Sequence, residues 1–255
     1  MAKTTDWCRL CDQIRPLINA HIYPRALLSE MIAAGETPIS QAVDASTFPK
    51  RVPVGWYDPT ILCAGCDHDL LGPLDASGVD FLRLPFRAGE MTVASGVGPY
   101  VERPGADARK LKLFAMSLLW RAGVSRRAEF AVAKLGPFEE LLRERIRISD
   151  PGSLDDFAVA FTIRPNDPGG LMLPPGRGRF RGGGPTVYVM HLGKHTIHLK
   201  VDHRRVPDSV RELFLGYGPA VRVAVGDVLG GHVGDILRKF VKARPALGDH
   251  AIRRK

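Results

Sequence analysis

Cys8-Arg9-Leu10-Cys11 opens the stretch of sequence that decides the N-terminal fold, His21-Ile22-Tyr23-Pro24 follows it, and Cys63-Ala64-Gly65-Cys66 closes it. The two Cys-x₂-Cys pairs contain all four cysteines of the chain. This spacing is typical of structural zinc sites, in which four thiolates surround the ion and leave no position open. We therefore expect a zinc ion that stabilises the fold, bound by Cys8, Cys11, Cys63 and Cys66. The alternative is a set of buried or redox-active cysteines without metal.

The composition describes a chain with enough apolar residues for a large core. It has 255 residues, 45% of them hydrophobic, so folding is expected to bury roughly three quarters of the unfolded surface. Residues 1–7 contain no apolar segment of a signal peptide. The longest apolar stretch, residues 111–120, reaches about half a membrane span and contains Lys112. We therefore expect a soluble, cytoplasmic protein, and in a reducing compartment paired cysteines favour metal over disulfide.

Charge is distributed unevenly along the chain. The formal net charge is +9; residues 1–100 hold 8 Lys/Arg and 11 Asp/Glu, a balance of −3, and residues 101–255 hold 28 and 16, a balance of +12. This basic C-terminal part predicts a polyanionic partner, most simply nucleic acid. The alternative is a solvated basic surface that binds no partner.

Apolar periodicity predicts helices in two parts of the chain. One helix is expected from Arg25 to a stop at Gly35, and another after the second cysteine pair. Residues 108–147 are expected to form three helices, of which the first ends at Gly123, the second runs from Ser125 to Leu135 and the third covers residues 138–146. The polar, proline-rich residues 35–60 are expected to be loop.

After Pro151 the apolar pattern changes to a period of two, which predicts strands. The most specific prediction is a hairpin with a two-residue type II′ turn at Gly193-Lys194. This turn fixes the register of the two strands: Leu192 lies opposite His195, Met190 opposite Ile197, and Tyr188 opposite Leu199.

The other elements of this region are predicted from shorter patterns. Residues 157–163 and 221–225 are expected to be strands. Short helices are expected after Pro207 and at residues 236–241. The Pro/Gly/Arg-rich residues 165–185 are expected to form a flexible loop.

These patterns together predict an α+β fold with three regions. Residues 1–80 form the Cys₄ zinc module, a treble clef in which one cysteine pair comes from a turn and the other from the start of a helix. Residues 81–150 are helical. Residues 151–255 form a basic, antiparallel β-rich region with short helices, and this region contains the loop at residues 165–185.

The order Cys-x₂-Cys, His-Ile-x-Pro, Leu-Cys-x₂-Cys resembles the zinc-containing branch of the HNH endonucleases, the ββα-metal nucleases. The resemblance covers about residues 5–75. It implies a metal-dependent hydrolase that cleaves phosphodiester bonds in nucleic acid, primarily DNA, with a histidine as general base. Residues 57–75 together with Leu119-Trp120-Arg121 also resemble a less characterised bacterial HNH-like group.

The resemblance implies a role for each matching residue, with the four cysteines as structural zinc ligands. His21 falls at the position of the general base, and Asp58 at the position of an Asn that orients this histidine. Asp67 falls at the position of a ligand to a catalytic Mg²⁺ or Mn²⁺, and His68 is a further candidate ligand. Ala20 departs from the family pattern, which has Asp or His there as the other ligand.

A glycine- and arginine-rich segment, residues 176–182, indicates a second contact with nucleic acid. Arg177, Arg179 and Arg181 are expected to bind phosphates, and Phe180 to stack on a base. The alternative is a flexible basic loop that binds nothing.

Three functions are compatible with the sequence. The first is an HNH-like endonuclease that acts on nucleic acid. The second is a catalytically inactive treble-clef protein that binds nucleic acid or a protein partner, an alternative that Ala20 favours. The third is a structural or regulatory subunit whose basic face contacts another protein. No membrane partner is expected.

Overall fold

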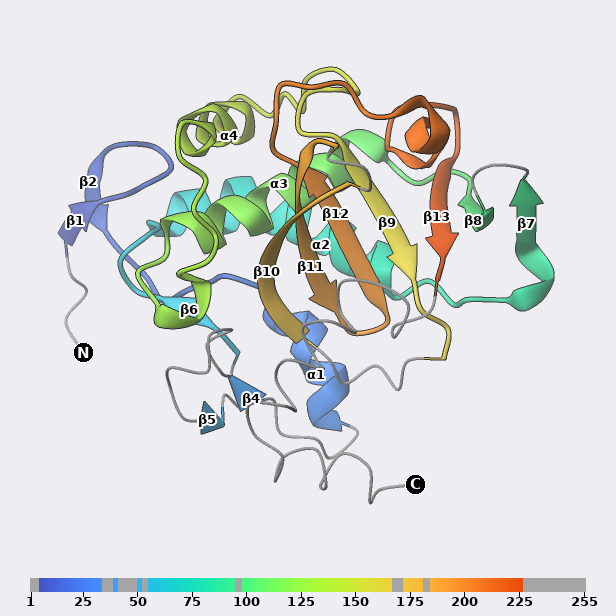
Figure 1. The fold of residues 1–255 in the computed structure, drawn as a ribbon. Helices are drawn as coiled ribbons and strands as arrows, with labels where there is room; N and C mark the ends of the chain where they lie inside the picture. Colours follow the sequence, from blue (N-terminus) through green and yellow to red (C-terminus); the bar gives the residue numbers. More distant parts are fainter. Residues whose placement is uncertain are drawn as a thin grey trace, which may run out of the picture.

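A computed structural model of the protein describes residues 5–33, 39–40, 50–51, 55–94, 98–166, 172–180 and 184–226. Helices and one large mixed sheet give the predicted α+β class (Figure 1). None of the helices in these residues has the length and apolar character that crossing a bilayer requires. The helical segments are α1 (Arg25–Ala33), the π-helix η1 (Gly65–Leu71), α2 (Gly72–Leu82), α3 (Ala108–Val124) and α4 (Phe138–Arg147), with the 3₁₀ turns η2 (Ala88–Glu90), η3 (Ala128–Phe130) and η5 (Asp208–Leu213).

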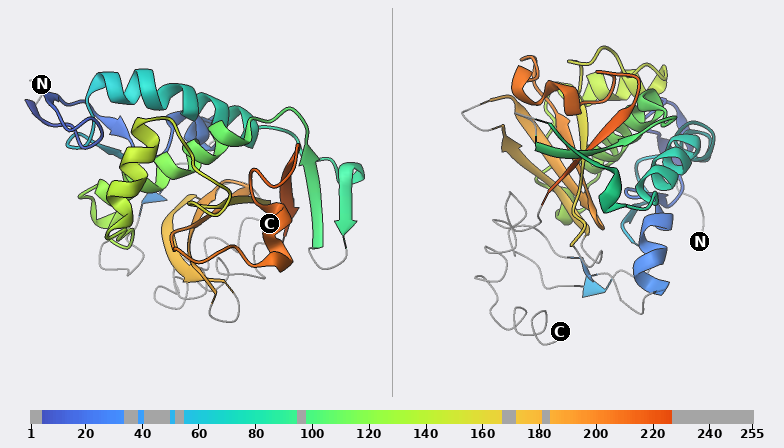
Figure 2. Two further views of the ribbon diagram at one scale, coloured as in Figure 1. Left: turned by 90° about the horizontal axis from the view of Figure 1, so that it is seen from above. Right: turned by 90° about the vertical axis from the view of Figure 1, so that its right-hand side faces the viewer.

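Seven strands form the main sheet in the order β10-β11-β12-β9-β13-β8-β7. These strands are β7 (Met91–Ala94), β8 (Gly98–Arg103), β9 (Val159–Ile163), β10 (Met172–Arg179), β11 (Thr186–Leu192), β12 (His195–Lys200) and β13 (Val221–Val225). Neighbouring strands are antiparallel except β9 and β13, which are parallel. The sheet is therefore mixed, which corrects the antiparallel prediction. Figure 2 shows that it is strongly curved and that α2, α3 and α4 lie on one side of it.

The predicted β11–β12 hairpin is confirmed together with its register. Leu192 pairs with His195, and the next two expected pairs follow along the strands. Gly193 has a φ of 60° in the turn, a conformation that glycine adopts without steric cost. Met190 and Ile197 are fully buried, so the period-two pattern identified the face that packs against the helices.

Helix α3 is the centre of the fold. Asp107 caps its N-terminus by accepting hydrogen bonds from the backbone N–H groups of Arg109 and Lys110, both at 3.0 Å. Every residue from 111 to 122 is buried, because the helix packs against α2, α4 and the sheet. The helix continues through the predicted stop at Gly123 to Val124. That glycine is needed for packing, since a Cβ there would lie 2.3 Å from the Leu135 side chain.

The helix predicted for residues 125–135 is wrong, because only the short turn η3 forms there. Hydrogen bonds hold the chain in another conformation: the Ser125 hydroxyl and the Arg126 N–H both donate to the Asp58 carboxylate, at 2.8 and 3.2 Å. Phe130 is then buried edge-on against Tyr23 and Trp56, with ring centroids 5.9 and 6.0 Å apart. Tertiary contacts thus override local helix propensity.

The loop predicted for residues 165–185 is also wrong in part, because strand β10 occupies its middle. β10 is an edge strand that pairs with β11, and the register shifts between Leu173 and Gly176. Pro174 and Pro175 fall in this irregularity, where a missing N–H is tolerated. Strands β7 and β8 were not predicted at all, and they add a hairpin to the other end of the sheet.

Several other predicted elements agree with the structure: α1, the helix after the second cysteine pair, α4, η5, β9 and β13 lie where they were expected. The loop predicted for residues 35–60 is wrong in part, because this stretch contains three short strands, which are β4 (Ile39–Ser40), β5 (Lys50–Arg51) and β6 (Tyr57–Asp58). The helix expected at residues 236–241 lies outside the described residues.

The larger of two hydrophobic clusters in the described residues runs without a break from the first cysteine to the sheet. Its buried side chains extend from Cys8 through Trp120 of α3 to Val223 of β13. The N-terminal residues, the helices and the sheet therefore support one another. The boundaries expected near residues 80 and 150 stay predictions.

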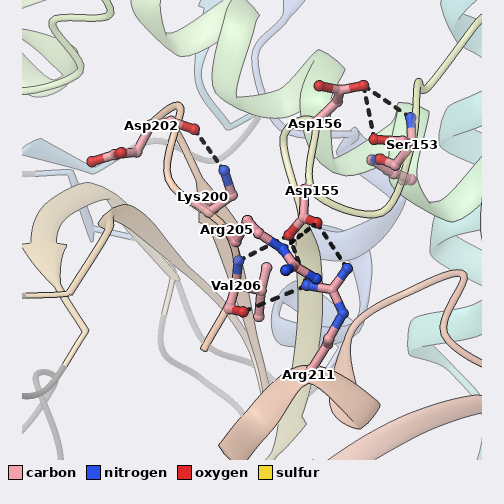
Figure 3. Close-up of polar contacts among 9 residues, drawn as sticks. Ser153, Asp155, Asp156, Lys200, Asp202, Arg205, Val206 and Arg211 are labelled. Atoms are coloured by element: carbon pink, nitrogen blue, oxygen red, sulfur yellow. Dashed lines mark hydrogen bonds and ion pairs between the residues drawn. The ribbon is translucent and has the colours of Figure 1, made fainter. Parts of the chain in front are cut away.

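A polar network closes the end of the sheet beyond β9 and β12 (Figure 3). The Asp155 carboxylate accepts two hydrogen bonds from Arg211, at 2.9 and 2.7 Å, and a third from the Val206 N–H at 2.9 Å. Arg205 lies 3.7 Å away. The hydrogen bond from Arg211 lowers the pKa of Asp155 to about 2, although burial opposes the shift. These contacts fix the connection between β12 and η5.

Candidate metal centre and the histidine beside it

The first cysteine pair lies in the turn between β1 (Thr5–Trp7) and β2 (Ile14–Pro16). The Cys8 N–H donates to the Gln13 carbonyl, and the Asp12 N–H donates to the Cys8 carbonyl, both at 2.9 Å. Asp12 has a φ of 58°, a left-handed conformation that aspartate tolerates in tight turns. The tight turn brings Cys8 and Cys11 close together.

The second pair lies where an extended segment enters η1. Cys63 forms a β-bridge with Leu17, and the Arg9 N–H donates to the Ile61 carbonyl at 2.9 Å. Cys66 follows in the first turn of η1. These backbone contacts place the second pair directly beside the first turn.

The four sulfur atoms converge, all within 4.8 Å of one another. Sulfurs around a tetrahedral zinc ion lie about 3.8 Å apart, given Zn–S bonds of about 2.3 Å, so small side-chain rotations suffice to accommodate the ion. The Cys63 N–H also donates to Sγ of Cys8 at 3.3 Å, a contact that stabilises a thiolate. The donor set therefore fits a structural zinc. Among the described residues, no other group of three or more His, Cys, Asp or Glu side chains converges in this way.

The protonation of the thiols reflects their crowding. A hydrogen bond from the Cys66 thiol lowers the pKa of Cys8 to about 4, against the opposing effect of burial. The same bond raises the pKa of Cys66, and burial raises the pKa of Cys11. Neighbouring thiols therefore resist ionising together. A divalent cation overcomes this resistance by replacing their protons, so its binding releases protons and weakens in acid.

His21 lies in β3 (Ala20–His21), which pairs with β6 close to the second cysteine pair. Ala20 lies opposite Asp58, and His21 lies opposite Tyr57. The His21 and Tyr57 rings meet edge-on with centroids 6.4 Å apart. Since directly opposed residues share a face of the pair, Asp58 lies on the face of Ala20, and His21 lies on the other.

The Asp58 carboxylate is buried and bound by other partners. One oxygen accepts from the Thr60 N–H and hydroxyl, at 2.9 and 2.7 Å, and the other accepts from Ser125 and Arg126. Burial raises its pKa, but these hydrogen bonds outweigh that effect and lower it. Asp58 thus joins β6 to the end of α3. These bonds do not support the orienting role implied for it, which stays a prediction.

Asp67 and His68 follow the last cysteine on η1, a π-helical segment of the kind that is frequent at functional sites. A carboxylate oxygen of Asp67 lies 3.6 Å from Nε2 of His68. Burial raises the pKa of Asp67, while the charges of Arg121, His68 and His21 oppose the shift. In the described part of the chain no third donor converges on Asp67 and His68.

Arg121 of α3 ties this region together, a role that the sequence did not reveal. Its side chain is 1% exposed and binds the Asp75 carboxylate through two bonds, at 3.0 and 2.6 Å. The same guanidinium donates to the His21 carbonyl at 2.9 Å. The available signal was an arginine within an apolar helix, in the Leu119-Trp120-Arg121 element. A buried charge of this kind needs a partner, and Asp75 is that partner.

The residues of the arginine-rich segment differ in how far they are exposed. Arg177 and Arg179 are exposed on β10. Phe180 is half-buried and packs against Phe214, with ring centroids 5.9 Å apart, so its ring is engaged in packing rather than presented to a base. Arg181 lies outside the described residues.

Comparison of the chain with protein-family models, with curated proteins and with solved structures finds no match. Functional inference therefore depends on the residues of this chain alone. The features that bear on it are the four converging cysteines, the positions of His21 on β3 and Asp67 on η1, and the buried Arg121–Asp75 pair.

Proposed function

We propose that Cys8, Cys11, Cys63 and Cys66 bind one structural zinc ion in a treble-clef module of a cytoplasmic protein. The turn that carries the first pair, the helix start that carries the second and the sulfur distances within 4.8 Å support this assignment. With four thiolates bound, the ion has no open position, so it contributes folding free energy and no chemistry.

We further propose that this module is an HNH-like endonuclease that hydrolyses phosphodiester bonds in nucleic acid, primarily DNA. Strands β3 and β6 pair with each other, and the helix formed by η1 and α2 follows β6, which gives a ββα arrangement with α1, β4 and β5 inserted between the two strands. The placement of His21 on β3 and of Asp67 on η1, which follows the paired strand β6, carries the proposal.

In this reaction His21 accepts a proton from water while the water oxygen bonds to phosphorus and the bond to the leaving oxygen breaks. The leaving oxygen takes a proton from solvent. Arg121 holds the His21 carbonyl and hence β3 in position. Asp67 and His68 would hold Mg²⁺ or Mn²⁺ jointly with water and phosphate oxygens, as Mg²⁺ is commonly bound. The cation would stabilise negative charge at the phosphate.

A cleavage assay with matched histidine variants tests the proposal. Zinc-loaded protein is incubated with plasmid DNA and single-stranded RNA, with Mg²⁺ or Mn²⁺, alongside His21→Ala and His203→Ala. The second variant controls for loss of an imidazole, because His203 lies on the surface against Phe138. We expect metal-dependent cleavage that is lost only in His21→Ala. Cleavage that survives in His21→Ala would overturn the assignment of the base.

The second candidate function is a catalytically inactive zinc module that binds nucleic acid or a protein partner. Two observations favour it: Ala20 is fully buried where the family has a ligand, and only two donors are present at Asp67 and His68. In the same assay this candidate predicts no cleavage of either substrate by folded, zinc-loaded protein.

A further inference from the structure

Four exposed cations on two separate segments form a basic track, which we define as Arg126, Lys134, Arg177 and Arg179. Arg126 and Lys134 belong to the connection between α3 and α4, and Arg177 and Arg179 belong to β10. Within the described residues, none of the four side chains forms an ion pair. Their positive charge is therefore available to a partner.

The two segments of the basic track are joined by a buried tyrosine. The Tyr188 hydroxyl of β11 donates to the Lys134 carbonyl at 2.6 Å. Arg177 lies directly opposite Tyr188 in the β10–β11 pair, and its charge acts on that hydroxyl by opposing the rise in pKa that burial causes. β10 also contacts η3. Lys134 and Arg177 therefore lie near one another, although they are distant in sequence.

The spacing of the cations on β10 is regular. Arg177 and Arg179 occupy alternate positions, opposite Tyr188 and Thr186, so they share a face and their Cα atoms lie about 6.7 Å apart. Each nucleic-acid strand carries one phosphate for about every 3.4 Å of helix rise. Both cations can therefore contact one extended polyanion, and a phosphate backbone supplies such a row of negative charges.

The absence of neutralising acids distinguishes this surface from most of the molecule. Arg127, the neighbour of Arg126, is paired with Glu129 at 2.8 Å. On α4, Arg143 and Arg147 pair with glutamates three residues earlier. Most arginines elsewhere in the described chain thus meet carboxylates, although Arg15 and Arg164 bond neutral groups instead. The basic track concentrates four unneutralised charges and gains from an anionic partner.

The basic track adjoins the proposed catalytic module. The Arg126 N–H donates to the Asp58 carboxylate at 3.2 Å, and the Arg127 guanidinium donates to the Tyr57 carbonyl at 3.2 Å. Both acceptors belong to β6, the strand that pairs with His21. The basic track is therefore joined to the module through β6, on the side of Asp58 rather than on that of His21.

We propose that the basic track binds the phosphate backbone of nucleic acid. Its contact with β6 deepens the proposed endonuclease function, but binding at the track does not require that function, because none of its residues takes part in cleavage. Phe180 and Arg181 are not needed for it. The proposed binding surface therefore differs from the arginine-rich segment predicted from the sequence, because it combines residues of β10 with residues of the connection between α3 and α4.

Equilibrium binding to a fluorescent DNA duplex and to the matching single strand, without added Mg²⁺ or Mn²⁺, tests this proposal. The variant Arg177→Gln/Arg179→Gln lowers the net charge by two, and so does the control Arg109→Gln/Lys110→Gln. The control residues are exposed in the first turn of α3, about 21 Å along the helix axis from Val124, the residue at which the helix ends before Arg126. Circular dichroism and zinc content establish that both variants are folded.

We expect the Arg177→Gln/Arg179→Gln variant to bind both DNA forms at least about tenfold more weakly than the native chain at about 0.1 M salt. The slope of log K against log salt concentration is expected to be smaller in magnitude by about two, because two phosphate contacts are lost. The control variant is expected to bind as the native chain does. Equal losses in both variants would overturn the proposal, as would no binding by the native chain at low salt. Binding of polyglutamate in place of DNA would reassign the surface to an acidic protein. A chain that binds DNA but never cleaves it would overturn the endonuclease and leave the track in place.

Discussion

The cysteine module (residues 5–33 and 55–82) and the seven-stranded sheet are stabilised by different means. Strands β1, β2, β3 and β6 have only two or three residues each, and every residue of β1 and β2 is exposed. In the sheet, all seven residues of β11 are buried. Such short hairpins bury too little apolar surface to be stable alone. Under the proposed zinc assignment, the module depends on metal binding and the sheet depends on apolar packing.

The largest expected effect is that of removing the metal. Structural zinc sites contribute about 10–16 kcal/mol of apparent binding free energy, so chelation or Cys66→Ser is expected to unfold β1, β2 and η1 first. Amide hydrogen exchange measures the two regions separately. We expect exchange in the module to become fast while the amides of β11 and β12 stay protected, and restored zinc to reverse the effect in the native chain. If the amides of the module stay protected from exchange without metal, the two regions are not stabilised by different means.

The next effect concerns the ion pair that joins the module to α3. Arg121→Met leaves the Asp75 carboxylate and the His21 carbonyl without their donor, so we expect a loss of about 3–5 kcal/mol in the free energy of unfolding. Arg121→Lys keeps the charge but cannot bind both carboxylate oxygens in the same plane, and it is expected to recover only part of the loss. Urea unfolding measures both variants. A lysine variant as stable as the native chain would rule out the bidentate role.

A smaller effect is expected in the sheet. Ile197 of β12 is fully buried, so Ile197→Val removes one methylene group from a close-packed core and is expected to lower the free energy of unfolding by about 1 kcal/mol. Val93 of β7 is 72% exposed, so the control Val93→Thr is expected to change it by less than about 0.5 kcal/mol. Thermal unfolding with and without chelator measures the stability of both variants. Equal losses at the two positions would contradict the packing account of the sheet.

The smallest effect is expected at the network around Asp155, and it depends on pH. The pKa of Asp155 is about 2 in the folded chain and 3.8 as its ordinary value, so its contribution is present above pH 3.8 and is lost as the pH falls toward 2. Asp155→Asn is expected to lower the free energy of unfolding by about 0.5 kcal/mol at neutral pH and by progressively less in acid. A loss that stays constant from pH 6 to the acid limit of folding would contradict the ion-pair assignment.

The sequence revealed those features that depend on local spacing. The cysteine spacing identified a four-thiol site, and the period-two pattern together with the turn at Gly193 identified the β11–β12 register. The long apolar stripe identified α3. In each case the deciding residues lie within one element or one motif, so the pattern survives whatever packs against it.

The features that the sequence missed depend on contacts between distant segments. Residues 125–135 have helical propensity, but the Asp58 carboxylate holds their first turn in another conformation. β10 contains two prolines that indicate loop, yet its place at the sheet edge tolerates them. The partner of Arg121 and the neighbours of Phe180 likewise become known only when the chain is folded.

The central claim is tested most directly by measuring the metal content of the chain and the reactivity of its four cysteines. Chains purified without added metal or chelator are analysed for metals by mass spectrometry, and their thiols are titrated before and after denaturation with chelator. We predict one zinc ion per chain, with cysteines that react only after the metal is removed. Chains that contain no zinc while all four thiols react freely, or that contain disulfides, would contradict the account.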